Sequence, residues 1–284
     1  MTSTASKAAT ELLKFYATVF CLRDAPLCAT TQLKPPVETL DGVIVDESSM
    51  LTALLNLDSS KSPGADEITP RMLKHCAYSL SIPITKLFNH SLNCGQVPVD
   101  WKCGIITPIF KGGNRSEAVN YRPVTLLPTI SKVLEKLVAR KLVDHLEKHD
   151  LISASQHGFR RRHSCLSNLL LALDDWTRAV DGGETVHACY LDMSKAFDRV
   201  DHNILLRKLK EHGIGGKILT WLANYLTDRT VRVRVDGALS DPAAVTSGVP
   251  QGSVLGPILF LLYVNDIPEL MHCDTAMFAD DIKP

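Results

Sequence analysis

The chain contains 284 residues, of which 45% are hydrophobic, so it can bury a sizeable core in one large domain or two small ones. Its 31 basic and 31 acidic side chains cancel to a formal net charge of zero, so overall charge alone does not indicate a nucleic-acid partner. Lys14 and Arg23 interrupt the only early apolar stretch, and the apolar run at 254–264 is too short to cross a bilayer. We therefore expect a soluble, intracellular protein (nucleus or cytoplasm) without a signal peptide or transmembrane segment.

The charges are unevenly distributed along the chain. Residues 101–163 carry 12 Lys/Arg against 5 Asp/Glu, whereas residues 164–284 carry 11 against 16. Such a distribution suits a protein that grips phosphates with one part and metal ions with the other. Ordinary solvated helix faces would produce the same counts, so this alternative stays open.

The cysteines exclude two classes of site. None of the eight forms a CxxC pair or a paired Cys/His spacing, so neither a zinc site nor a disulfide framework is predicted. Several lie in apolar runs, where we expect buried free thiols, and this favours a reducing, intracellular compartment.

The first third of the chain is predicted to be mainly helical. Residues 10–22 place Leu12, Tyr16 and Phe20 on one face of an amphipathic helix. A second helix is predicted at 47–57, capped by Asp46 or Ser48. After a turn-rich, basic segment at 59–66, further helices are predicted at 70–80 and 84–94.

A hairpin with two cations follows. Residues 105–110 are predicted to form a strand that ends at Lys111 and a Gly-Gly tip, and residues 121–127 form the returning strand, with Arg122 near its start. Lys111 and Arg122 would then clamp a triphosphate between them. Two unremarkable surface cations are the alternative.

A second cationic segment lies between two predicted helices, at 130–149 and 166–180. It places Arg160, Arg161 and Arg162 next to Phe159, the combination of cations and an aromatic ring that binds a nucleic-acid backbone.

Three carboxylates follow apolar stretches in the last third of the chain. Val186 and residues 189–191 predict a core strand that ends at Asp192, and residues 277–279 lead to Asp280 and Asp281 at a hairpin tip. Adjacent carboxylates near a third repel one another unless cations hold them. Two divalent ions about 4 Å apart are the apparatus for in-line phosphoryl transfer. Three solvated turn aspartates are the alternative.

Between these carboxylates the chain predicts helices at 202–209 and 217–226 and a strand at 230–235 that alternates Val with Arg and returns through 243–245. The glycine-containing loop 247–253 then leads into an apolar helix at 254–264. The glycines of this loop let its backbone approach a ligand closely, and the N-terminus of the helix that follows favours anions.

Taken in this order, seven stretches resemble the reverse transcriptases of non-LTR (LINE-type, jockey-like) retrotransposons. They are SPGAD (62–66), DWK…ITPIFKGG (100–113), NYRPVTLLP (120–128), QHGFRRRHSC (156–165), YLDMSKAFDRVDH (190–202), SGVPQGSVLGPILFLLYVNDIP (247–268) and FADD (278–281). The family often carries Gly-Arg where this chain has Arg162-His163.

The resemblance implies an α+β, right-hand polymerase fold, with helical fingers that include a hairpin and with an antiparallel palm sheet. Residues 1–60 would be a helical connector, residues 61–183 the fingers and residues 184–284 the palm. Because the chain ends just after FADD, we expect the returning strand of that hairpin, part of the palm and the thumb to be absent. We therefore expect weak or no activity from this chain alone, with Asp280 held on a loose edge.

The resemblance also implies roles for individual residues. Asp192, Asp280 and Asp281, with the backbone carbonyl of Met193, would bind two Mg²⁺ ions, or Mn²⁺ in their place. The other implied site residues are Phe197 for selection of deoxynucleotides, Lys111 and Arg122 for the triphosphate, Gln251 and Gly252 for the template base and nascent pair, and Arg160, Arg161 and Arg162 for the nucleic acid.

The implied partners are an RNA template, a DNA primer and dNTPs, with no membrane. Asp198 belongs to the same motif, and we predict a structural role for it in capping the turn into the next helix. Two alternatives remain: an intron-encoded reverse transcriptase or maturase, and a non-catalytic nucleic-acid-binding remnant. The motifs Lys-Ala-Phe-Asp and Pro-Gln-Gly favour the retrotransposon type over the intron type.

Overall fold

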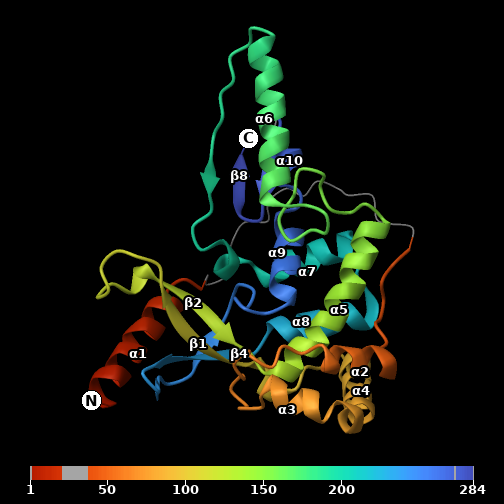
Figure 1. Cartoon of the computed structure of the whole chain (residues 1–284), viewed down its shortest axis with the longest axis vertical. Helices are drawn as coiled ribbons and strands as arrows, with labels where there is room; N and C mark the ends of the chain where they lie inside the picture. Colours follow the sequence, from red (N-terminus) through yellow and green to blue (C-terminus); the bar gives the residue numbers. More distant parts are fainter. Residues whose placement is uncertain (1, 21–37, 272, 284) are drawn as a thin grey trace.

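The computed structural model describes residues 2–20, 38–271 and 273–283, and these form a mixed α+β fold (Figure 1). Its helices are α1 (Thr2–Ala17), α2 (Glu47–Leu55), α3 (Pro70–His75), α4 (Ala77–Cys94), α5 (Thr129–Lys148), α6 (Cys165–Asp181), α7 (His202–Glu211), α8 (Gly216–Leu226), α9 (Leu255–Val264) and α10 (Ile267–Leu270). Its strands are β1 (Cys103–Phe110), β2 (Tyr121–Leu126), β3 (Leu191–Asp192), β4 (Arg229–Val235), β5 (Ala238–Leu239), β6 (Ala243–Val245), β7 (Ala276–Phe278) and β8 (Asp281–Lys283).

The strands form two sheets. The larger has the order β2-β1-β4-β5, with β6 also on β4; β1 and β4 run parallel and the other pairs antiparallel. The smaller is antiparallel with the order β3-β8-β7. The predicted hairpin at 105–127 is confirmed, because β1 and β2 pair from Ile105 opposite Leu126 to Phe110 opposite Tyr121.

The main core lies among the helices, with α9 at its centre. Nearly every residue of α9 is apolar and most are buried, so this helix packs against neighbours all around its axis. Glu135 of α5, only 1% exposed, accepts hydrogen bonds at its Oε2 from the backbone N–H of Val254 (2.7 Å) and Leu255 (3.3 Å). A buried carboxylate thus caps the start of α9 and ties that helix to α5.

A second, smaller core holds the N-terminal helix. Ala9, Leu13 and Tyr16 on one face of α1 pack against Ile106 of β1 and Val231 and Val233 of β4. The helix predicted at 10–22 therefore exists, but it begins at Thr2 and ends at Ala17, and residues 21–22 lie outside the described residues. Figure 1 shows α1 beside the larger sheet, on the opposite side of the molecule from α2.

The helix boundaries between residues 70 and 94 differ from the prediction. The first helix ends at His75, and α4 begins at Ala77 and runs without interruption through Pro83. Proline disfavours the helix interior because it lacks an N–H and its ring meets the preceding turn. Burial of Ile84, Phe88 and Leu92 on the core side of α4 outweighs this local cost.

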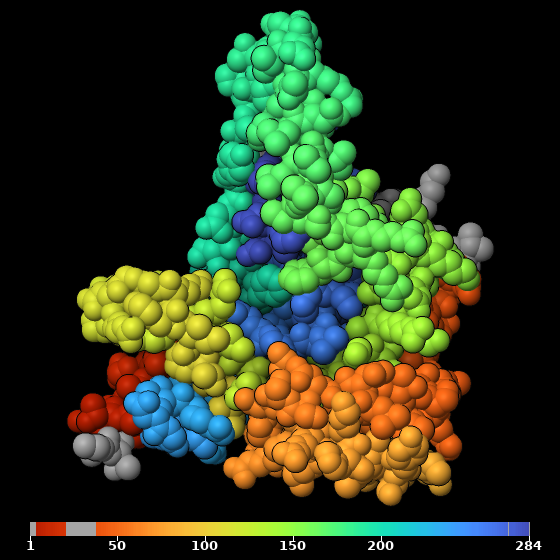
Figure 2. Space-filling model, viewed as in Figure 1, coloured from red at the N-terminus to blue at the C-terminus, as the bar shows by residue number. Residues whose placement is uncertain are grey.

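The predicted core strand before Asp192 is wrong. Only Leu191 and Asp192 form a strand, and residues 184–190 are irregular, with Tyr190 65% exposed. Among the described strands β3 pairs with β8 alone, so no second strand lies beside β3 to cover its apolar side chains. Figure 2 shows α6 and this segment projecting together from the rest of the surface.

The predicted absence of a returning strand after FADD is also wrong. Residues 281–283 form β8, which pairs with both β7 and β3 and so is the central strand of the smaller sheet. The two-residue turn is Ala279-Asp280, and Asp281 is the first residue of β8.

The prediction of buried thiols is wrong for most cysteines. Cys103 is half-buried, and the others in the described part of the chain are exposed: Cys76, Cys94, Cys165, Cys189 and Cys273. The apolar runs that contain Cys165 and Cys189 face solvent, which explains the error; Cys21 and Cys28 lie outside the described residues. Within the described ranges, no helix combines the length and the apolar character that crossing a bilayer requires.

Candidate active site

One cavity of about 770 Å³ brings together most of the predicted site residues. Its lining comes from five separate segments: the β1–β2 hairpin, Phe159 in the loop between α5 and α6, residues 192–198, residues 250–257 and the β7–β8 hairpin. The predicted residues that line it are Lys111, Arg122, Asp192, Met193, Phe197, Gln251, Gly252, Asp280 and Asp281. In Figure 2 the blue surface of the C-terminal third is visible between the yellow hairpin and the green projection.

The three carboxylates meet at one end of the smaller sheet. Asp192 on β3 lies directly opposite Asp281 on β8, and Asp280 occupies the turn that precedes β8. Directly opposed residues of an antiparallel pair place their Cβ atoms on the same face, about 4.5–5.5 Å apart. Like charges so placed repel, which a bound cation would relieve.

These carboxylates fit a hard divalent cation by ligand type, since such ions take oxygen ligands. Their side chains do not form a ready-made coordination group: across residues 2–20, 38–271 and 273–283, no three His, Cys, Asp or Glu side chains gather as metal ligands. The chain therefore brings the right oxygen donors to one cavity without closing a coordination shell.

Phe197 is held between two other aromatic rings. It stacks on Phe260 of α9, with ring centroids 4.2 Å apart and an interplanar angle of 17°. Phe159 meets it edge-on, at 6.4 Å and 84°. The backbone carbonyl of Phe197 also accepts a hydrogen bond from Val249 N–H at 2.9 Å. Its ring is thus fixed in position at the cavity wall.

The loop 247–252 is joined to the segment that contains Phe197. Gly248 N–H donates to Val200 O at 2.8 Å, and Ser247 Oγ donates to Asp198 O at 2.8 Å. Gly248 has φ +86°, and a Cβ there would lie 2.7 Å from Asp198 O, so only glycine permits this approach. The same loop is also joined to β2, because Thr125 N–H donates to Gln251 O at 2.9 Å.

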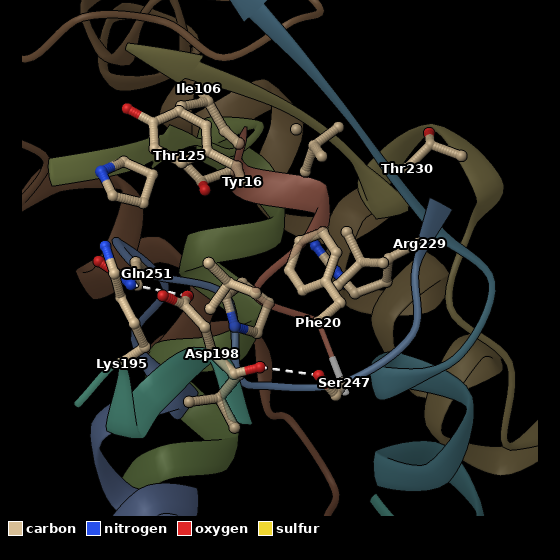
Figure 3. Close-up of a pocket in the computed structure, with 17 residues that line it drawn as sticks. Tyr16, Phe20, Ile106, Thr125, Lys195, Asp198, Arg229, Thr230, Ser247 and Gln251 are labelled. Carbon is tan, nitrogen blue, oxygen red and sulfur yellow. Dashed lines mark hydrogen bonds between the residues drawn. The ribbon is translucent and has the colours of Figure 1, made fainter. Parts of the chain in front are cut away.

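Asp198 belongs to the site instead of capping the next helix. Gln251 Nε2 donates to Asp198 Oδ1 at 2.7 Å (Figure 3). The cap of α7 is Asp201. Burial raises the pKa of Asp198, while the hydrogen bond from Gln251 and the charges of Lys195 and Lys111 oppose that rise. Asp198 also lines a smaller neighbouring cavity that Tyr16 and Phe20 close from the N-terminal side (Figure 3).

The two hairpin cations reach the cavity from one side. Lys111 and Arg122 are exposed, and neither forms an ion pair with any described residue. Both are therefore available to a negatively charged ligand.

The three arginines at 160–162 do not line this cavity and differ from one another. Arg160 Nη1 donates to the backbone carbonyls of Ser153 (2.9 Å) and Gln156 (3.3 Å). Arg161 pairs with Asp144 at 3.3 Å and lies 3.7 Å from Glu147. Arg162 is exposed at a left-handed backbone position, φ +62°.

Sequence reasoning did not assign Phe159 and Lys195 to the cavity, although both line it. It also gave no role to Gln156, which is 2% exposed. The signal available for Gln156 was the neighbouring Gly158, because a glycine in a polar loop often marks a close backbone approach.

Comparison with known proteins is consistent with this geometry. The model of the family "Reverse transcriptase (RNA-dependent DNA polymerase)" matches residues 110–283. The chain is 36% identical over 235 residues to the "Probable RNA-directed DNA polymerase from transposon X-element" of Drosophila melanogaster, which covers 81% of this chain and 26% of that protein.

Two further relatives from Drosophila melanogaster are similar. The chain is 33% identical over 230 residues to the "RNA-directed DNA polymerase from mobile element jockey" (81% of this chain, 25% of that protein). It is 32% identical over 274 residues to the "Probable RNA-directed DNA polymerase from transposon BS" (91% and 28%). The chain thus spans about a quarter of the length of these relatives. It belongs to the reverse transcriptase (RNA-dependent DNA polymerase) family, as a domain of the non-LTR, LINE type.

Proposed function

We propose that this chain is the fingers and palm part of an RNA-directed DNA polymerase that extends a DNA primer on an RNA template with dNTPs. The observation that carries the proposal is the cavity that collects three carboxylates, an aromatic wall and two unpaired cations from five segments of the chain. In this proposal residues 61–183 are the fingers, residues 184–284 the palm and residues 1–60 a connector. Its partners are nucleic acids and dNTPs, so the protein would act in the nucleus or cytoplasm.

Asp192, Asp280 and Asp281, with the carbonyl of Met193, would hold two divalent ions, Mg²⁺ or Mn²⁺. Such ions, when bound, activate a primer 3′-hydroxyl and neutralise the leaving pyrophosphate. The smaller sheet supports this role because the register of β3 and β8 brings Asp192 and Asp281 together. The protein's own contribution is to hold these oxygens at one end of the cavity.

The remaining residues would orient the substrates. Lys111 and Arg122 are placed to attract the triphosphate from the hairpin side, since both are exposed at the cavity. Phe197 would exclude a ribonucleotide, because a ring held by Phe260 and Phe159 cannot move aside for a 2′-hydroxyl. Gln251 and Gly252 would support the template base and nascent pair, and Arg160, Arg161 and Arg162 the template strand.

A second candidate function, binding of nucleic acid without turnover, is favoured by one observation. Arg162, Lys111 and Arg122 form no ion pair with any described residue, so phosphates can reach all three without displacing a partner. Exposed Arg162, Lys111 and Arg122 would still attract phosphates in such a remnant.

Primer extension on an RNA template, with dNTPs and Mg²⁺, tests the proposal. The variants are Asp192→Asn and Asp280→Asn, with Asp236→Asn on the β4–β5 turn, outside the cavity, as the matched control. We expect the first two to lose activity by at least about 10³-fold with little change in template–primer affinity, and the control to keep full activity. Activity that survives Asp192→Asn would refute the proposed site.

Absence of extension by the unaltered chain, together with RNA binding that weakens in Arg162→Ala, would instead favour the non-catalytic remnant. Measurement of that binding at two salt concentrations would identify the phosphate contacts, because neutralised phosphates release counterions.

A further inference from the structure

Gln156 lies in the loop between α5 and α6, and its side chain reaches the turn that carries Asp280. Its Oε1 accepts hydrogen bonds from Ala279 N–H at 2.9 Å and from Gly158 N–H at 2.7 Å. Its Nε2 donates to Ala279 O at 3.4 Å. One buried amide thus pairs with both backbone groups of the residue immediately before Asp280.

Ala279 needs such a restraint. It has φ +57°, the left-handed region, where the Cβ of an L-residue meets the following carbonyl. A glycine would adopt this conformation without cost, but the turn contains Ala279 and Asp280. The backbone position of Asp280 therefore depends on contacts from outside the hairpin, and Gln156 supplies two of them.

The rest of the loop packs along the outer edge of β7. Met277 N–H donates to Ser155 O, and His157 N–H donates to Met277 O, both at 2.9 Å. A Cβ on Gly158 would lie 2.5 Å from Ala279 N, so the loop and the turn touch backbone to backbone. The edge of β7 that faces away from β8 is therefore covered by the loop, and the expectation that Asp280 is held on a loose edge is wrong.

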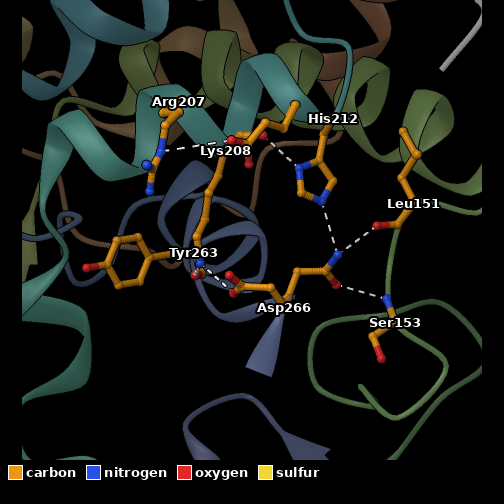
Figure 4. A network of polar contacts seen from close by, with 9 residues as sticks. Leu151, Ser153, Arg207, Lys208, His212, Tyr263 and Asp266 are labelled. Atoms are coloured by element: carbon orange, nitrogen blue, oxygen red, sulfur yellow. Dashed lines mark hydrogen bonds and ion pairs between the residues drawn. The ribbon is translucent and has the colours of Figure 1, made fainter. Parts of the chain in front are cut away.

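The start of this loop is itself anchored to the core. Asn265 donates from Nδ2 to Leu151 O and accepts at Oδ1 from Ser153 N–H, each at 2.8 Å (Figure 4). Its Nδ2 also contacts His212 Nε2 at 3.0 Å. The loop that presents Gln156 is thus fixed by residues that follow α9 and α7.

We propose that Gln156 is a positioning residue for Asp280: its amide holds the left-handed turn at Ala279 and so sets where the Asp280 carboxylate stands in the cavity. Gln156 does not line the cavity, so it acts only through the turn. The inference rests on the proposed function in one respect, that Asp280 is a metal ligand.

The test compares Gln156→Leu and Gln156→Glu with a matched control, all in the full 284-residue chain. Asn89 makes the same kind of contact far from the site: it accepts from Val45 N–H at 2.9 Å and donates to Val45 O at 2.8 Å. Asn89→Leu therefore removes an equivalent amide pair without touching the turn. Gln156→Glu keeps an acceptor for Ala279 and Gly158 but loses the donor.

Two readouts are needed, hydrogen exchange of residues 277–283 in the metal-free protein and Mn²⁺ binding by electron paramagnetic resonance. We expect Gln156→Leu to speed exchange at Ala279 by about tenfold or more and to weaken Mn²⁺ binding by a similar factor. Gln156→Glu should retain most of the exchange protection. Asn89→Leu should leave both readouts at the wild-type level.

Wild-type exchange and Mn²⁺ binding in Gln156→Leu would overturn the positioning role, as would an equal loss in Asn89→Leu. Primer extension by the wild-type chain and by Asp192→Asn separates this result from the proposed function. If Gln156→Leu loosens the turn and weakens Mn²⁺ binding while primer extension survives Asp192→Asn, the positioning role stands and the polymerase proposal fails.

Discussion

Phe197 illustrates, at the scale of one residue, how distant segments prepare a side chain for its role. Its ring is stacked on Phe260 and met edge-on by Phe159, and Val249 binds its backbone carbonyl. Aromatic pairs of this kind contribute about 0.5–1.5 kcal/mol beyond the area they bury. In its proposed role, a ring held on two sides would not yield to an extra substituent on a sugar.

Phe197→Ala should therefore relax sugar selection. We expect the ratio of kcat/KM for a dNTP over the matching rNTP to fall by about tenfold or more, because the clash with a 2′-hydroxyl is removed. Single-nucleotide incorporation would measure the ratio. Phe197→Tyr, which keeps the ring, is the control, and an unchanged ratio in the alanine variant would contradict the assignment.

Glu135 shows the same dependence on distant residues in a structural role. It is buried, its carboxylate accepts from two N–H groups at the start of α9, and burial raises its pKa although those N–H groups oppose the rise. Each N–H would otherwise be a buried donor without a partner, at a cost of about 1–3 kcal/mol. Glu135 therefore stabilises the helix that carries Phe260.

At the scale of elements, α4 shows that packing can override a local preference. The helix is continuous from Ala77 to Cys94, although Pro83 within it lacks a backbone N–H donor. The helix persists because its core face, with Ile84, Phe88 and Leu92, is buried. The break instead falls at Cys76, one residue after the end of α3.

Pro83→Ala should therefore stabilise the protein. We expect the free energy of unfolding to rise by about 1–3 kcal/mol, because alanine restores the hydrogen bond and is the best helix former. Urea denaturation would measure this. Pro70→Ala is the control, since Pro70 lies in the first turn of α3, where proline is tolerated. A loss of stability in Pro83→Ala would mean that proline's effect on the unfolded chain dominates.

On the scale of the whole molecule, buried histidines link the core to the loops around the site. His212, 1% exposed, donates from Nδ1 to Lys208 O at 2.7 Å and accepts at Nε2 from Asn265 (Figure 4). The ring of His145 in turn binds the backbone carbonyl of His212. A second proton on Nε2 of His212 would face the Asn265 Nδ2 donor. Burial lowers the pKa of His212, although the charges of Glu211 and Asp266 oppose this effect.

The contribution of His212 to stability should consequently fall as pH falls. A base with a lowered folded-state pKa binds fewer protons folded than unfolded, so its contribution is full above its unfolded pKa of about 6.5 and is lost below it. We expect the free energy of unfolding to fall less between pH 7.5 and 5.5 in His212→Gln than in the wild-type protein, because the variant lacks the titrating imidazole. The scale of the difference is about 1.36 kcal/mol for each unit of pKa shift.

Chemical denaturation of both proteins at the two pH values would measure this difference. The comparison isolates His212 from Glu135 and Asp198, whose raised pKa values act with the opposite sign. Equal pH dependence in the two proteins would show that the His212 proton has no part in folding.

Much of the fold was predictable because the signals are local. The apolar spacing in α5, α7 and α8 and the Gly-Gly tip between β1 and β2 each lie within a few residues of the structure they produce. The errors at residues 184–190, at the exposed cysteines and at β8 arose where burial or pairing depends on a distant neighbour.

By itself, the sequence determined the family and most helices, because the order of its motifs and the periodicity of its apolar residues are carried within each segment. Only the tertiary structure decided that Asp192 faces Asp281, that Gln251 binds Asp198 and that Gln156 holds Ala279 across 123 positions of the chain. The physical reason is that register and burial belong to pairs of segments, and a pair is specified only when the chain has folded.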